Sequence, residues 1–100
     1  MYEVIYMKAD YEPWWMFEDW EEMVRLRKKF DELEEAVVFA NSLINEMRTF
    51  FTLEKSKKGA FIAFWNPGER SYCDGCDEDM QLYHGVFLLK DVEPIIFLNE

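Results

Sequence analysis

The sequence predicts an α+β fold, in which a small antiparallel sheet of about four or five strands has two helices packed on one face, in the order β-α-α-β-β-β. Two observations lead to this prediction. Residues with high strand propensity are concentrated in short runs at the beginning and in the second half of the chain, whereas the middle follows a period of about 3.6 residues. The connections between the runs are short, which favours antiparallel neighbours. With 100 residues, 50% of them hydrophobic, the chain is expected to form a single domain over residues 1–100.

Residues 1–7 and 60–65 are the clearest strands. The first run is rich in strand formers and ends at polar residues. The second run is apolar at every position, which is typical of a central strand covered on both faces. The sequence Asn-Pro-Gly-Glu at residues 66–69 is a turn signal, so residues 70–73 are expected to return as the second arm of a hairpin.

The remaining segments of the second half are expected to be a loop and two strands. Residues 54–59 are mostly charged and are predicted to form a polar loop. Residues 83–89 are predicted to be a strand, and residues 94–98 a short last one.

A first helix is expected shortly after Pro13, which forces the preceding residue toward an extended conformation. Asp19 and Glu22 have the spacing of a helix-starting capping pair. Four apolar side chains then fall on one side at spacings of three and four: Phe17, Trp20, Met23 and Val24.

A second, longer helix follows the capping pair Asp31 and Glu34. Apolar residues between Leu33 and Phe51 keep a helical period with few exceptions. A helix of about 20 residues is about 30 Å long, enough to cover a sheet of ordinary size from end to end.

The acidic charge of the chain makes some classes of binding partner less favourable than others. The sequence holds 21 acidic and 11 basic residues, for a formal net charge of −10, which disfavours binding to nucleic acid phosphates. Residues 1–22 and 59–100 each have a net charge of −6, whereas residues 23–58 have a net charge of +2. The basic side chains of that middle part are expected to lie on a solvated helix face and in a polar loop.

The sequence predicts a cytoplasmic protein that does not enter a membrane. No uncharged apolar run approaches the roughly 18 residues that span a bilayer. The first ten residues contain Glu3, Lys8 and Asp10 and lack a basic leader, so they are not expected to be a secretory signal.

Cys73 and Cys76 are the two cysteines, and His84 is the one histidine. Thiolates two residues apart can share a zinc ion, His84 could be a third ligand, and Asp77 could be the fourth, with Glu78 and Asp79 as alternatives. A second Cys/His pair, which a strong zinc signature would have, is absent from the sequence.

Two other interpretations of the same residues stay open. The Cys-x-x-Cys spacing is also that of thiol redox proteins, but neighbouring carboxylates raise a thiol pKa and make this chemistry less favourable. Alternatively, the cysteines are structural, Asp77 caps a short helix over residues 78–82, and His84 forms local hydrogen bonds.

Aromatic residues are dense between Tyr11 and Trp20. The candidate partner-binding residues are Tyr11, Trp14, Trp15, Phe17 and Trp20. The alternative is that all of them belong to the core, where large rings bury the most area. Adjacent tryptophans in an extended or loop conformation point in opposite directions, so at least one of Trp14 and Trp15 is expected at the surface, inside an acidic rim.

Several of these motifs together resemble the family known as domain of unknown function 1033. The opening motifs are residues 1–7, Asp10, residues 12–15 and Trp20, and the closing motifs are residues 63–65 and 73–77, Gln81, residues 83–84 and residues 88–90. The resemblance runs nearly from end to end. It implies a small cytoplasmic protein of Gram-positive bacteria, and it supplies no activity, cofactor or catalytic residue.

The sequence favours an interaction module over an enzyme. It contains no Gly-rich phosphate loop and no Gly-x-Ser-x-Gly motif, so no catalytic residues are predicted. The leading hypothesis is a non-catalytic regulatory or interaction module that binds another protein, or a second copy of itself, through an aromatic surface. The alternative is a zinc-binding or thiol-dependent protein centred on the cysteines and the histidine.

Overall fold

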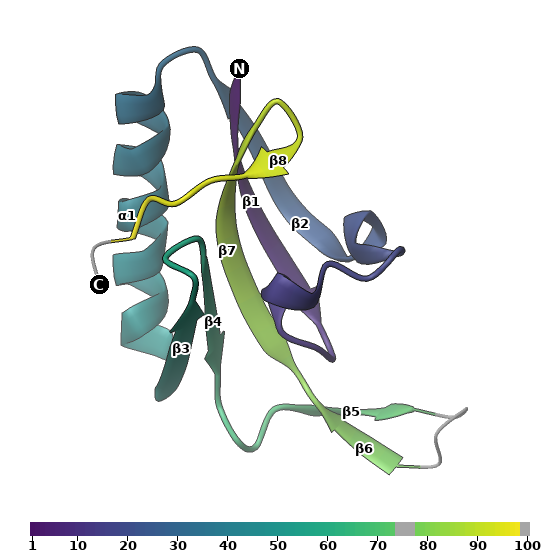
Figure 1. The fold of residues 1–100 in the computed structure, drawn as a ribbon. Helices are drawn as coiled ribbons and strands as arrows, with labels where there is room; N and C mark the ends of the chain where they lie inside the picture. Colours follow the sequence, from purple (N-terminus) through teal and green to yellow (C-terminus); the bar gives the residue numbers. More distant parts are fainter. Residues whose placement is uncertain (74–77, 99–100) are drawn as a thin grey trace.

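The computed structural model describes residues 1–73 and 78–98 and confirms an α+β fold with a mostly antiparallel sheet (Figure 1). The main sheet has six strands in the order β2-β1-β7-β4-β3, with β8 pairing β7 off this path. These strands are β1 (Tyr2–Ala9), β2 (Val24–Phe30), β3 (Leu53–Lys57), β4 (Phe61–Trp65), β7 (Tyr83–Lys90) and β8 (Glu93–Pro94).

The centre of the sheet is the antiparallel pair of β1 and β7, which runs from Tyr2 opposite Lys90 to Ala9 opposite Tyr83. β7 also pairs β4, and both strands are largely buried. Apolar residues at successive positions of these strands face opposite sides of the sheet, so each side needs its own cover.

Helix α1 (Leu33–Phe50) covers one face of the sheet. Its buried residues are Ala36, Ala40, Ile44 and Met47, at helical spacings of four, four and three. They pack against a row of strand residues that includes Val4, Phe64 and Leu88. No helix in the described part of the chain is both long and apolar enough to cross a membrane.

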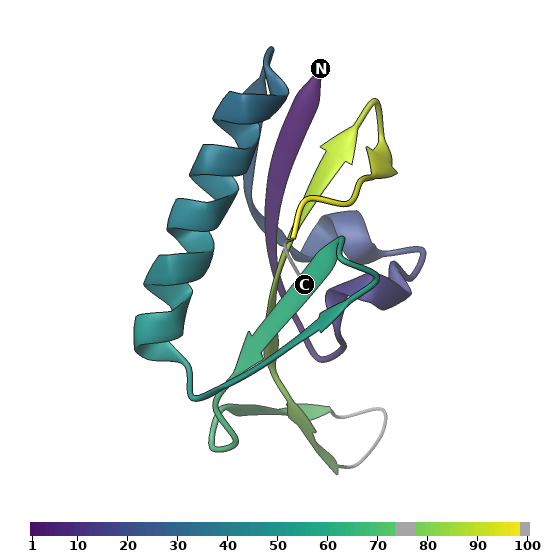
Figure 2. The same ribbon diagram turned by 60° about the vertical axis from the view of Figure 1, so that its left-hand side comes forward.

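The segment between β1 and β2 covers the opposite face (Figure 2). It contains two short 3-10 helices, η1 (Pro13–Trp15) and η2 (Trp20–Met23). Its side chains pack over a second row of strand residues, which includes Ile5, Met7 and Phe87. The protein therefore has three layers: helix α1, the main sheet, and the aromatic-rich segment between β1 and β2.

Pro13 packs directly on the backbone of the sheet. It lies over Gly85 of β7, where a Cβ atom would be 2.6 Å from the Cβ of Pro13 and 2.7 Å from its Cγ. Only a glycine leaves room for the proline ring at this position.

A second, two-stranded sheet projects beyond the end of the main sheet at which β7 begins (Figure 1). It is formed by β5 (Arg70–Cys73) and β6 (Glu78–Gln81). The side-chain amide of Gln81 ties its base to the preceding turn, because Nε2 donates to the carbonyl oxygens of Asn66 at 2.8 Å and Glu69 at 2.9 Å.

The prediction of a first helix after Pro13 is wrong. After the single turn of η2 the chain forms the edge strand β2, so α1 is the one α-helix among the described residues. The helical period before β2 rested on only four apolar residues. The following run instead alternates, with Leu26, Lys28 and Phe30 on the same face of the sheet as Tyr6, Val4 and Tyr2, their partners in β1.

Further corrections concern the second half of the chain. Residues 54–57 of the predicted polar loop at 54–59 belong to edge strand β3, whose backbone pairs with β4 and extends the sheet. Residues 70–73 pair with β6 and not with β4, and residues 78–81 are a strand where a short helix was considered. The last strand is limited to residues 93–94.

The predicted helix caps are also incorrect. The N-cap positions of η2 and α1 are Asp19 and Glu32, and neither side chain forms a capping hydrogen bond. Helix α1 therefore relies on packing of its apolar face against the sheet and not on a side-chain cap.

Candidate functional site

The two adjacent tryptophans point to different environments. Trp14 is half-buried and packs against the sheet core, whereas Trp15 keeps 54% of its surface exposed. The ammonium group of Lys57, on edge strand β3, lies 5.6 Å from the ring centroid of Trp14 and 5.4 Å from that of Trp15. Both indoles therefore have a cation within the range of a cation–π interaction.

Trp15 and Phe17 form a stacked pair at the surface. Their ring centroids are 6.1 Å apart with an interplanar angle of 3°, and Phe17 is 49% exposed. Tyr11 packs edge-on against Phe17 with a centroid distance of 4.7 Å. We call these three residues, Tyr11, Trp15 and Phe17, the aromatic patch.

Local backbone geometry presents the aromatic patch. Pro13 occupies the first turn of η1, where its fixed φ is favourable and its missing N–H costs nothing. Met16, between the two stacked rings in sequence, has a φ of 43° in the left-handed region. This turn of the chain lets both Trp15 and Phe17 leave the sheet on the same side.

Two carboxylates follow the patch directly in the sequence. Glu18 and Asp19 are exposed, and the Tyr11 hydroxyl donates a hydrogen bond of 3.3 Å to Oδ1 of Asp19. Burial, followed by the negative charge of Asp19 and this hydrogen bond, raises the pKa of Tyr11 to about 12. Tyr11 is therefore a neutral hydrogen-bond donor at physiological pH.

Trp20 is not part of the exposed patch. It is only partly accessible, and its ring packs edge-on against Phe87 with a centroid distance of 5.5 Å. The Arg27 guanidinium lies 5.9 Å from the ring centroid of Trp20. Of the five predicted residues, Trp15 and Phe17 are exposed, whereas Tyr11, Trp14 and Trp20 are partly buried and pack against the core. Tyr11 also contacts the exposed Phe17 ring.

His84 is the centre of a second cluster, which lies on the helix-covered side of the sheet. Its side chain is only 7% exposed. Nδ1 lies 2.6 Å from the Tyr6 hydroxyl, and Nε2 lies 2.7 Å from Oε1 of Glu69. The ring also packs on Phe51, with centroids 4.3 Å apart, and Lys8 lies 3.5 Å from the other carboxylate oxygen of Glu69.

The hydrogen bonds of this cluster have a definite direction when His84 is neutral. Because the ionised carboxylate of Glu69 can only accept, Nε2 carries the proton and Nδ1 accepts from the Tyr6 hydroxyl. Partial burial opposes ionisation of Glu69, but its hydrogen bonds and electrostatic interactions with His84 and Lys8 outweigh this effect and lower the Glu69 pKa.

The Tyr6 hydroxyl is not activated as a nucleophile or base. Burial, and then the negative charge of Glu69, raise the pKa of Tyr6, and the opposing effect of Arg25 is smaller. The cluster therefore holds β1, β7 and the turn before β5 together rather than preparing a reactive phenolate.

Sequence reasoning missed Tyr6 and Glu69 as partners of His84. The interpretation of local hydrogen bonds is wrong, since Tyr6 is 78 residues away in sequence and Glu69 is 15 residues away. A histidine inside an apolar strand signals that buried polar partners exist, but it does not identify them.

The predicted zinc or thiol site stays a prediction. Cys76 and Asp77 lie outside the described residues, and for Cys73 only the backbone, at the end of β5, is described. Both ring nitrogens of His84 are engaged by Tyr6 and Glu69 in this structure. Within residues 1–73 and 78–98, no cluster of three or more potential ligands could hold a metal ion.

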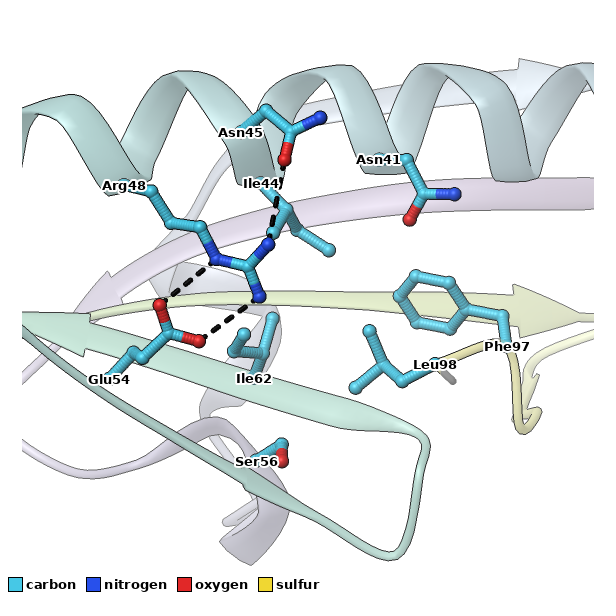
Figure 3. A pocket seen from close by; sticks show the side chains of 9 residues that line it. All are labelled: Asn41, Ile44, Asn45, Arg48, Glu54, Ser56, Ile62, Phe97 and Leu98. Atoms are coloured by element: carbon cyan, nitrogen blue, oxygen red, sulfur yellow. Dashed lines mark hydrogen bonds and ion pairs between the residues drawn. The ribbon is translucent and has the colours of Figure 1, made fainter. Parts of the chain in front are cut away.

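A pocket of about 430 Å³ lies between α1, β3, β4 and the C-terminal segment (Figure 3). Arg48 and Glu54 form a two-pronged ion pair at one end, with N–O distances of 3.0 and 3.1 Å. The other lining residues are Asn41, Ile44, Asn45, Ser56, Ile62, Phe97 and Leu98. The two charged side chains of the pocket are therefore paired with each other.

Comparison with known protein families identifies the family of this chain. The family described as "Protein of unknown function (DUF1033)" matches residues 1–100, which is the entire chain. No curated protein and no solved structure matches it. The resemblance to this family is thereby confirmed, and the chain belongs to the DUF1033 family.

Proposed function

We propose that this protein is a non-catalytic interaction module whose aromatic patch binds a cationic segment of another protein, in the cytoplasm as the family resemblance implies. The observation that supports this most directly is the stacked, half-exposed pair of Trp15 and Phe17. Aromatic side chains inside a polar rim are the usual anchors of protein interfaces.

The charge around the patch favours a cationic partner. Residues 1–22, which include the patch, contain seven acidic residues and one basic residue. The position of Lys57, 5.4 Å from the Trp15 ring centroid, supports the idea that a partner's arginine or lysine can use the same kind of contact. A partner segment that combines arginine with apolar residues would match both the rings and the carboxylates.

The test is a selection of random displayed peptides on the immobilised protein, followed by affinity measurements on synthetic copies of the enriched peptides. We expect arginine and lysine to be enriched next to apolar residues. Phe17→Ser should abolish binding, and Phe50→Ser is the matched control, because Phe50 is 67% exposed at the end of α1 on the other side of the sheet. Enriched peptides that bind both variants equally would show that the patch is not the binding surface.

Self-association through the patch is the competing outcome of this experiment. Sedimentation of the purified protein over a range of concentrations distinguishes the two cases. A dimer that dissociates in Phe17→Ser, combined with no peptide enrichment, would mean that the partner is a second copy of this chain.

A further inference from the structure

We infer that edge strand β2 is a second binding surface, which accepts an extended, acidic segment of a partner protein as an added strand. This inference is independent of the aromatic patch. It rests on three features of the described residues: the open edge of β2, its positive charge, and an apolar groove where the strand meets α1.

β2 has an unpaired side. It is the outermost strand at its end of the sheet and pairs only with β1 among the described strands (Figure 1). Five of its seven residues are exposed, at positions 25–29. The backbone N–H and C=O groups of such an edge can pair with another extended chain.

The charge of β2 contrasts with the charge of the whole protein. Four of the 11 basic residues of the chain lie in this strand, which contains no acidic residue: Arg25, Arg27, Lys28 and Lys29. Arg27 is paired with Glu3 and Glu21, whereas Arg25 and Lys29 form no ion pair with any described residue. Two β2 edges would repel each other, so the charge favours an acidic strand over pairing with a second β2.

The groove lies at the end of β2, on the side of the sheet that α1 covers. It has a volume of about 530 Å³ and is lined by Phe30 and by Glu34, Glu35, Val38, Phe39 and Ser42 of α1. The rings of Phe30 and Phe39 pack 5.5 Å apart, and Val38 is 65% exposed. This groove fits one or two aliphatic side chains, and its two glutamates disfavour an acidic residue there.

The register of β2 predicts the pattern of the bound segment. Lys28 and Phe30 lie opposite Val4 and Tyr2, on the helix-covered face, whereas Lys29 lies opposite Glu3 on the other face. Side chains of an added strand would alternate between these faces in the same way. Aliphatic residues should therefore face the groove, and carboxylates should face Lys29.

The test uses the full chain and the peptide acetyl-Glu-Val-Glu-Val-Glu-Val-Glu-amide. We expect binding that weakens with added salt, with the largest changes in backbone amide resonances along residues 24–30. A peptide of the same composition with its three valines adjacent should bind at least about tenfold more weakly, because it cannot alternate between the two faces.

Two pairs of charge reversals complete the design. Arg25→Glu with Lys29→Glu should weaken peptide binding about tenfold or more, whereas Lys55→Glu with Lys58→Glu makes the same charge change elsewhere and should have little effect. Val38→Ser should weaken binding without altering its salt dependence.

Equal weakening by both charge pairs, or resonance changes outside β2, would overturn the inference. So would binding of a single-stranded oligonucleotide to β2 in the absence of peptide binding.

Discussion

Nε2 of His84 lies 2.7 Å from Oε1 of Glu69, and this contact ties the central strand β7 to the turn that precedes the projecting hairpin. The opposite nitrogen contacts Tyr6 on β1, so one buried ring links three separate segments of the chain. The contact has measurable consequences, because it lowers the pKa of an acidic group in the folded state.

Glu69→Gln should reduce stability in a pH-dependent way. The folded-state pKa of Glu69 is lowered from its ordinary value of 4.5. Its contribution is therefore present above about pH 4.5 and is lost as the pH falls through the lowered value. Urea unfolding between about pH 3 and about pH 7 should show a difference in unfolding free energy between wild type and Glu69→Gln that shrinks toward low pH.

Glu46→Gln serves as the control for this series, since Glu46 is an exposed carboxylate on α1. Its effect should be within about 0.5 kcal/mol throughout. A Glu69→Gln difference that stays constant with pH would contradict the assignment of the low pKa to Glu69.

Tyr11 should ionise only near the end of an alkaline titration. Its pKa is raised to about 12, first by burial and then by the charge and hydrogen bond of Asp19. Asp19→Asn should bring the pKa of Tyr11 closer to the ordinary value of 10.0, because it removes the negative charge. Ultraviolet difference titration measures this, and subtraction of the Tyr11→Phe curve isolates the signal. No change in Asp19→Asn would mean that the neighbouring carboxylate has no part in the shift.

Gly85→Ala should displace the aromatic covering from the sheet. The added Cβ would lie 2.6 Å from the Cβ of Pro13, so the proline segment must move. Overpacking of this kind costs about 1–3 kcal/mol in unfolding free energy. Gly68→Ala is the matched control, because nothing lies within 4 Å of its added Cβ, and its cost should be smaller.

A second substitution checks the cause of that cost. In a Pro13→Gly background the ring that clashes is absent, so Gly85→Ala should be less destabilising than in the wild type. Equal costs in the two backgrounds would show that the clash with Pro13 is not the reason.

Trp15 and Trp20 should differ in their effect on stability. Trp15→Ala removes a ring that is 54% exposed and should cost about 1 kcal/mol or less. Trp20→Ala removes a ring packed on Phe87 and should cost about 3 kcal/mol. Chemical unfolding of the two variants, monitored by circular dichroism, measures both values. A larger cost for Trp15→Ala would place Trp15 in the core and remove the basis of the proposed interface.

The parts of the fold that the sequence predicted correctly are those specified by local patterns. The helical period between Leu33 and Phe50 repeats over five turns, and the apolar runs that became β1, β4 and β7 are long enough to be unambiguous. Strand β2 was missed because four of its seven residues are basic, and the polar character of an edge strand hides its alternation.

The candidate sites were likewise predictable only where local sequence determines them. Exposure of one of the adjacent tryptophans followed from chain geometry, although the choice of Trp15 depended on the left-handed turn at Met16. The partners of His84 could not be predicted, since they come from strands and turns that meet only in the folded sheet. Register between distant segments is a property of tertiary packing and leaves no local signal.

Helix α1 and the segment between β1 and β2, which cover the two faces of the sheet, differ in their backbone hydrogen bonding. This difference determines which of them opens first. Helix α1 has a continuous ladder of amide hydrogen bonds, whereas the segment over the other face is bridged by scattered short-range ones, such as those from the Trp20 and Glu22 amides. Amide protons of that segment should therefore exchange with deuterium well before those of the helix, although several of its side chains pack against the sheet core. Thermal motion would therefore expose the face of the sheet that contains Ile5 and Phe87 first. Helix α1 would still be packed on the opposite face at that stage.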